Sequence, residues 1–97
     1  MRSSYLASEL IVGHEYRIVK EFRDFDGIEH RVDDRWIFRS KSFLPYDDGL
    51  SLFVETDGEE RQIRLQWRLE SQLDIIERFH EYAEEKHKSE QAAPRNR

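Results

Sequence analysis

Two adjacent carboxylates are the residues of this sequence best suited to chemistry. Asp47 and Asp48 follow Pro45 and Tyr46 in the stretch FLPYDDGLSLFV, between two apolar runs. Paired carboxylates can serve acid–base catalysis or offer oxygen ligands to a divalent cation. A turn explains the same residues, because proline fixes its own φ, aspartate favours early turn positions and Gly49 can take a left-handed conformation. We favour the turn and keep an enzyme or metal site on this loop as an alternative.

The four histidines give a weaker signal for a metal or catalytic site. His80, Glu84 and His87 would share one face of a helix and could hold zinc, although a solvated charged face explains them more simply. The run DFDG begins like a calcium loop, but its twelfth residue is Arg35 where an EF-hand has glutamate. An HExxH motif, a phosphate-binding glycine motif and cysteine are all absent from the sequence. We therefore expect a protein that is not an enzyme and has no metal or other cofactor.

A third candidate is the outward face of the strand expected over 61–68. Arg64 and Arg68 alternate there with apolar side chains, and Phe53 would lie close by if the preceding strand pairs with this one. Arginine beside an aromatic ring can stack on nucleic-acid bases or hold an acidic peptide. The alternative is a solvated strand face with cross-strand ion pairs, such as Glu55 with Arg61 or Arg64.

Charge and composition limit the possible partners. The net charge is −5 and is spread along the chain, whereas phosphate recognition relies on clustered lysine and arginine. Nucleic-acid binding would require Arg17, Arg39, Arg64 and Arg68 to form one patch. The lack of cysteine fits a reducing compartment, and no apolar run reaches the length of a signal peptide or a membrane span. We expect an acidic, soluble, cytoplasmic protein with no membrane partner.

The strands that must position these residues follow from a period of two. Alternating apolar side chains predict strands near 14–22, 33–43, 49–55 and 61–68, with a weaker one at 28–32. Asp26-Gly27 and Asp57-Gly58 are typical of type I′ turns. Phe43 has the opposite parity to Trp36, so burying both needs a bulge near residues 40–42.

Both tryptophans lie on the apolar face of their predicted strands. We therefore place Trp36 and Trp67 in the core rather than in a ligand site. On this basis Trp67→Ala would cost about 3–5 kcal/mol of stability.

From Ser71 the period changes to that of a helix. Ser71 with Asp74 forms a capping-box pattern, and positions 72, 75, 76, 79, 82 and 83 form a stripe, which predicts a helix over 72–87. Residues 89–97 are polar and are expected to be a disordered tail. The 97 residues suit one domain over 1–88. The fold class is mainly β (α+β), a small curled antiparallel sheet or SH3-like barrel of four to five strands with a C-terminal helix.

Several spaced motifs resemble a small bacterial family of domains of unknown function. They are Leu10-x-x-Gly13-x-x-Tyr16-x-Ile18, Phe22-x-Asp24-x-x-Gly27, Trp36-x-Phe38 and Phe43-Leu44-Pro45-Tyr46-x-Asp48-Gly49-Leu50-Ser51-Leu52. The resemblance covers about residues 10–85 and implies an SH3-like barrel without an assigned activity. The pattern also leads us to expect glycine at position 33, where this chain has Asp33.

The function we expect is a small interaction module that binds an unknown protein or peptide, as a monomer or weak homodimer. Nucleic-acid binding through the arginine face and an enzyme or metal site on the acidic loop are the alternatives. The candidate binding residues are Tyr46, Asp47, Asp48, Phe53, Arg64 and Arg68.

Overall fold

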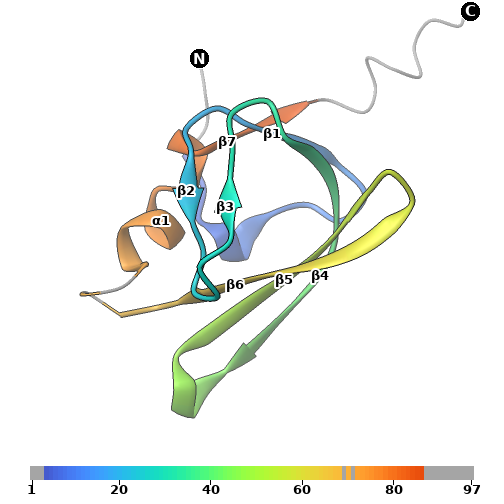
Figure 1. Ribbon diagram of the computed structural model, residues 1–97. Helices are drawn as coiled ribbons and strands as arrows, with labels where there is room; N and C mark the ends of the chain where they lie inside the picture. The colour runs from blue at the N-terminus through green and yellow to red at the C-terminus, as the bar shows by residue number, and fades with distance from the viewer. Residues whose placement is uncertain (1–3, 69, 71, 87–97) are drawn as a thin grey trace, which may run out of the picture.

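A curled antiparallel sheet makes up most of the protein (Figure 1). The computed structural model describes residues 4–68, 70 and 72–86. Its main sheet has five strands in the order β6-β5-β4-β1-β7, and a two-stranded hairpin, β2–β3, forms a separate sheet. The strands are β1 (Glu15–Ile18), β2 (Phe22–Arg23), β3 (Glu29–His30), β4 (Arg35–Leu44), β5 (Gly49–Thr56), β6 (Glu59–Gln66) and β7 (Ala83–Lys86). The helical elements are α1 (Leu73–Glu77) and the 3-10 helices η1 (Ala7–Glu9), η2 (Pro45–Asp47) and η3 (Phe79–Glu81).

One core lies on the inner face of the sheet. In β5 and β6 the apolar side chains alternate as predicted, so Leu50 lies opposite Leu65 and Leu52 opposite Ile63, all four buried. The other face of these two strands is polar or partly exposed. This regular alternation fixes the register, because a slip of one residue would expose every apolar side chain.

Aromatic rings connect the sheet to the segments that cover it. The centre of the Trp36 ring lies 5.5 Å from that of Tyr16 on the neighbouring strand and 6.5 Å from that of Phe79 in η3. Phe22 contacts the rings of Phe79 and Tyr82 edge-on, at 5.9 and 5.7 Å. Such pairs stabilise a small core beyond the area that they bury. The predicted core position of Trp36 is confirmed, since Trp36 is 5 % exposed.

The long strand β4 carries the bulge that the sequence predicted. The register shifts between Phe38 and Ser40, so the extra residue is Arg39, just before the predicted range. The shift turns Phe43 to the same face as the buried side chains of β5. Phe43 is nevertheless 45 % exposed, because it lies beyond the core, where its ring meets Trp67 edge-on at 5.8 Å.

Three aspartates adopt left-handed backbone conformations in turns. Asp57 (φ 54°) and Gly58 (φ 81°) both have positive φ, so the predicted type I′ turn between β5 and β6 is confirmed. Between β4 and β5, Asp48 takes the left-handed conformation (φ 50°) that we predicted for Gly49, which instead begins β5. Asp33 has φ 80°, a backbone conformation that glycine adopts without steric strain. This explains why the family pattern favours glycine at this position.

The DFDG segment reverses the chain, but it does not form a type I′ turn. Gly27 has positive φ (84°), whereas Phe25 and Asp26 at the centre of the turn do not. The Gly27 amide donates to the carbonyl of Asp24 at 3.0 Å, and the Asp24 amide donates to the carbonyl of Ile28 at the same distance. Glycine therefore closes the loop after the turn instead of forming its second central residue.

The C-terminal segment is not the helix over 72–87 that its apolar stripe predicted. α1 spans five residues, η3 follows, and the chain then extends into β7, which pairs with β1. Positions 76, 79, 82 and 83 are buried as expected, so the stripe identified buried residues correctly but not their backbone. An extended chain can form hydrogen bonds with the backbone groups at the free edge of β1. A continuing helix would leave those groups without partners. Ser71, the expected cap, and the tail 89–97 lie outside the described residues.

The sheet is curled but is not closed into a barrel, which corrects the expected SH3-like barrel. Its edge strands are β6 and β7, and the β2–β3 hairpin stands next to β6 without joining the sheet. Only the hairpin tip is drawn against β6 in Figure 1, where the amide of Phe25 donates to the carbonyl of Arg64 at 2.7 Å. No helix in the described part of the chain is long and apolar enough to cross a membrane.

Replacing Phe79 tests where the core lies. Phe79→Ala should lower the free energy of unfolding by about 3–5 kcal/mol, because the ring is fully buried among other aromatic side chains. Trp67→Ala should cost less than we expected from its sequence position, since Trp67 is only partly buried. Urea unfolding measures both losses. A larger loss for Trp67→Ala than for Phe79→Ala would contradict this placement.

Two buried tyrosines predict a loss of stability in alkali. Burial raises the pKa of Tyr16 and Tyr82 above the usual value of about 10. The folded protein therefore keeps protons that the unfolded chain loses, so their contribution to stability is complete below about pH 10 and is lost as the pH rises through the raised pKa values. Urea unfolding between about pH 8 and pH 11 should show this decline. The decline should be shallower in Tyr82→Phe, and an unchanged free energy of unfolding would contradict the assignment.

Candidate functional site

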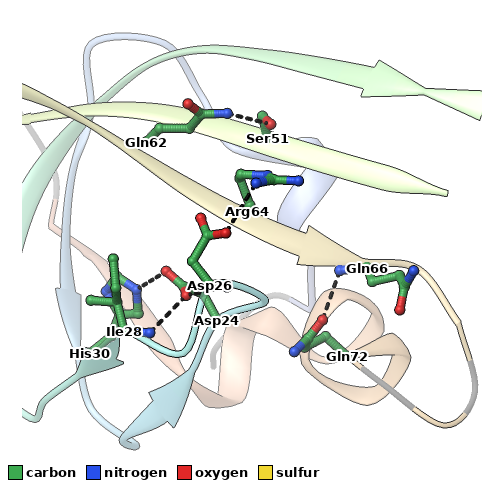
Figure 2. A network of polar contacts seen from close by, with 9 residues as sticks. All are labelled: Asp24, Asp26, Ile28, His30, Ser51, Gln62, Arg64, Gln66 and Gln72. Atoms are coloured by element: carbon green, nitrogen blue, oxygen red, sulfur yellow. Dashed lines mark hydrogen bonds and ion pairs between the residues drawn. The ribbon is translucent and has the colours of Figure 1, made fainter. Parts of the chain in front are cut away.

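A buried carboxylate fixes the β2–β3 hairpin. Asp24 is 2 % exposed, and its Oδ1 accepts the backbone amides of Asp26 (2.9 Å) and Ile28 (3.0 Å). Its Oδ2 lies 2.8 Å from Nε2 of His30, whose ring stacks on Phe22 at 4.8 Å. Figure 2 shows the contacts of the Asp24 carboxylate with Ile28 and His30 inside the hairpin loop. A buried carboxylate with all of these partners holds the loop in one conformation.

The hairpin tip joins Arg64 of β6. Asp26 Oδ1 accepts from Arg64 Nη1 at 3.0 Å, as Figure 2 shows, and the Arg64 guanidinium lies 5.6 Å from the centre of the Phe25 ring. The sequence predicted an arginine beside an aromatic ring, but with Phe53 as the ring. Phe53 pairs across the strands with Gln62 instead and is half-buried. The alternation of side chains along β5 and β6 gives no information about an aromatic ring that comes from a distant hairpin.

These residues form a groove on the outer face of the sheet. The groove has a volume of about 350 Å³ and lies where the hairpin tip, the end of β4 and the strands β5 and β6 meet. We call it the outer groove. Its walls include Phe25, Leu44, Ser51, Arg64, Gln66 and Arg68. Two predicted site residues, Arg64 and Arg68, therefore line one depression, with apolar side chains that the sequence did not single out.

The acidic loop is a turn, as we favoured. η2 begins at Pro45, and the amide of Asp48 donates to the Pro45 carbonyl at 3.2 Å. The Asp48 carboxylate accepts from Arg68 Nε at 2.9 Å, next to the outer groove. Tyr46 is 86 % exposed at this turn, and the side chain of Asp47 is not among those described. Asp48 therefore neutralises a groove arginine, and no group of three or more metal-binding side chains occurs in the described parts of the chain.

The predicted histidine face does not form. His80 lies in η3 and Glu84 in β7, so the two no longer share a helix, and His87 is outside the described residues. His30, held by Asp24, is the histidine that the sequence analysis missed. An acid that orients an imidazole also occurs in hydrolases, where the imidazole activates a nucleophile. Among the described residues, however, no hydroxyl group hydrogen-bonds His30, so we interpret this pair as a brace for the hairpin.

A second cavity opens on the other side of the hairpin, on the inner face of the sheet. It has a volume of about 540 Å³ and lies between β3 and the N-terminal half of β6. We call it the edge cavity. Its lining includes Ile28, His30, Trp36, Val54, Gln62 and Ile63. The β2–β3 hairpin thus separates two depressions, and the sequence analysis proposed no site at the edge cavity.

Arg17 and Arg39, the other two arginines that a nucleic-acid patch would need, are also paired with acidic side chains. Arg17 reaches Asp33 at 2.8 Å and Glu84 at 2.9 Å, and these hydrogen bonds raise the pKa of Arg17. Arg39 Nε donates to Glu55 at 2.9 Å, so Glu55 does pair across the strands but not with Arg61 or Arg64 as suggested. Arg17, Arg39, Arg64 and Arg68 thus each face a carboxylate.

Comparisons with known proteins agree with this fold. A family model described as a domain of unknown function (DUF3601) matches residues 3–88. No curated protein matches the chain. The solved structure of integron cassette protein VCH_CASS4, from the mobile metagenome of Vibrio cholerae, is similar with a TM-score of 0.79 and 38 % identity. The match covers 84 % of this chain and 93 % of that one. The expected resemblance to domains of unknown function is confirmed at this level of description.

The Asp24 brace gives a direct prediction. Asp24→Asn should lower the free energy of unfolding by about 1.5–3 kcal/mol, because a buried charge-assisted contact with His30 is lost. Asp26→Asn is the matched control in the same loop. It removes a half-exposed ion pair with Arg64 and should cost at most about 1 kcal/mol. Urea unfolding of both variants provides the comparison, and similar losses would show that the carboxylate does not brace the hairpin.

Proposed function

Since this chain belongs to the DUF3601 family of domains of unknown function, whose description assigns no activity, we propose that it is a non-enzymatic module that binds a partner protein. The proposed surface is the outer groove together with the exposed side chains at the β4–β5 turn. It includes four of the six residues that the sequence analysis named, namely Tyr46, Asp48, Arg64 and Arg68.

The observation that carries this proposal is the gathering of exposed apolar side chains at one end of the β4–β5 ribbon. Phe43 and Leu44 are 45 % and 49 % exposed, and Tyr46 is more exposed still. Phe25, which is 48 % exposed, lines the outer groove together with Leu44. The ribbon extends well away from the hairpin and helices in Figure 1, so a partner can reach its end. Large apolar and aromatic side chains that are exposed together are typical of interaction sites.

The arginines of the groove favour a protein partner over a nucleic acid. Arg64 and Arg68 are half-exposed, and each is already neutralised by an aspartate of this chain. A polyanion would have to compete with these aspartates, whereas an apolar partner would not. The paired guanidiniums can still stack on aromatic side chains or donate to carbonyl groups at the rim of an interface.

Nucleic-acid binding, the alternative from the sequence, can be tested directly. We expect a labelled 20-nucleotide single strand, DNA or RNA, to show no saturable anisotropy change at about 50 mM salt, where phosphate contacts are strong. The physical reason is the net charge of −5 together with the carboxylate beside each of the four arginines. Saturable binding that Arg64→Ala with Arg68→Ala abolishes would instead establish the nucleic-acid function.

Site-specific crosslinking tests the protein-binding proposal. A photoreactive phenylalanine analogue at Tyr46 should form adducts of defined mass with a partner in the host cell. The same analogue at Glu77, exposed on α1, is the matched control and should give none of these adducts. Replacing Phe43 and Leu44 with serine should remove the Tyr46 adducts without unfolding the domain, because both side chains are about half-exposed.

Three outcomes separate the possibilities. Adducts that depend on Phe43 and Leu44 support the proposed surface. An adduct of twice the chain mass would identify a second copy as the partner. The same adducts from both positions, or none from Tyr46, would overturn the proposal.

A further inference from the structure

The N-terminal half of β6 is an open sheet edge beside the edge cavity. β6 is an edge strand, and the β2–β3 hairpin reaches it through the bond from Phe25 to Arg64. From that contact the hairpin and the first half of β6 diverge (Figure 1), and the edge cavity occupies the space between β3 and β6. The curled sheet is therefore incomplete at this side.

The backbone groups that point out of this edge follow from the strand alternation. The Arg64 carbonyl accepts from Phe25, and Gln66 bonds Gln72 through both its amide (2.8 Å) and its carbonyl (3.1 Å), so these two residues face outward. Figure 2 shows the contact between Gln66 and Gln72. Because the pairing with β5 continues without a register shift, every second residue before them faces outward too, namely Gln62 and Glu60. These two have no backbone hydrogen bond on that side within the described residues.

An independent feature of the same cavity is a buried donor without an acceptor. Trp36 is 5 % exposed and lines the edge cavity, and its indole Nε1 has no hydrogen-bond partner among the described residues. Leaving a buried N–H unpaired costs about 1–3 kcal/mol, so such groups are rare and call for an explanation. Because Nε1 itself has no exposed surface, an oxygen atom of a ligand in the cavity would reach this donor once a neighbouring side chain moves aside.

We propose that the edge cavity binds an extended peptide segment of a partner protein, which adds to β6 as a further strand. Its backbone would pair with the outward groups of Glu60 and Gln62, in the manner of peptide recognition at open sheet edges. An apolar side chain would enter the cavity against Val54 and Ile63, and a carbonyl or amide oxygen of the segment would accept from Trp36 Nε1.

The charges around the cavity favour this occupant. Its walls carry both signs, with three carboxylates and two arginines, and therefore do not favour a simple cation or anion. They are Glu29, Asp34, Asp57, Arg35 and Arg61. Arg23 pairs with Glu29 at 2.8 Å and lowers its pKa, so this carboxylate is already neutralised. An uncharged peptide backbone with alternating donors and acceptors matches a mixed rim and an open edge. The site lies on the other side of the hairpin from the outer groove, so the inference does not rest on the function proposed for that groove.

The first test uses a random twelve-residue peptide library displayed on phage and selected on the intact domain. Selection should enrich sequences with alternating apolar residues. Synthetic copies of an enriched peptide are then methylated on one backbone nitrogen at a time. Methylation at every second residue should abolish binding, because those amides face β6, and methylation at the residues between them should have little effect. The proposal would be overturned if no peptide sequence were enriched, or if backbone methylation left the affinity of the enriched peptide unchanged.

The second test changes the domain. Gln62→Pro removes the outward amide and should weaken peptide binding at least about tenfold, while Gln62→Ala keeps that amide and should bind like wild type. Trp36→Phe removes the indole donor and should weaken binding about five-fold. In NMR spectra, the Trp36 indole proton should shift on peptide addition, and Trp67→Phe assigns the two indole signals. Melting temperatures check folding, and equal affinities for the proline and alanine variants would show that the peptide does not pair with β6.

Discussion

The structure around both candidate sites depends on the buried carboxylate of Asp24. Two backbone amides and an imidazole surround it, and together they hold the DFDG loop in one conformation. A carboxylate in such a place is stable only while every one of these partners is present. The loop in turn places the Phe25 ring against Arg64 on one side and Ile28 against the edge cavity on the other. One hydrogen-bonded residue thus determines the shape of two surface depressions.

The same hairpin accounts for the open sheet. At the base of the hairpin, the Phe22 ring packs against Phe79 and Tyr82 in the aromatic core. At its tip, the Phe25 amide donates to the backbone of β6. The hairpin therefore covers the inner face at an angle to β6 and does not continue the sheet. A barrel would have no free edge and no cavity here. Because this sheet stops at β6, the protein keeps a place where another strand can bind, while the end of the β4–β5 ribbon presents apolar side chains to a different partner surface.

Part of the fold could be predicted from single residues and their spacing. Alternation in β5 and β6 gave the core positions, and Asp57-Gly58 gave the turn between these strands. The position of Phe43 in the alternation predicted a bulge near residues 40–42, and the structure has it one residue earlier, at Arg39. Each of these depends on near neighbours along the chain or on one strand pair. The helix prediction failed because spacing identifies buried residues without fixing the backbone, and β7 was decided by the free edge of β1. The site was predicted in part for a similar reason, since Arg64 and Arg68 were found but their aromatic neighbour Phe25 comes from another hairpin.

The sequence by itself determined a small, mainly β domain with an aromatic core, an acidic turn after Pro45 and a strand with arginines on its outward face. It could do so because side-chain direction in a strand has a period of two and turn residues have local conformational preferences. Only the tertiary structure decided that Asp24 braces His30, that Asp48 neutralises Arg68 and that the Trp36 indole lacks an acceptor. The first contact depends on how the hairpin closes, and the other two features depend on how separate segments pack together, so local preferences could not reveal them. For the same reason, the open edge of β6 became visible only when the hairpin was placed.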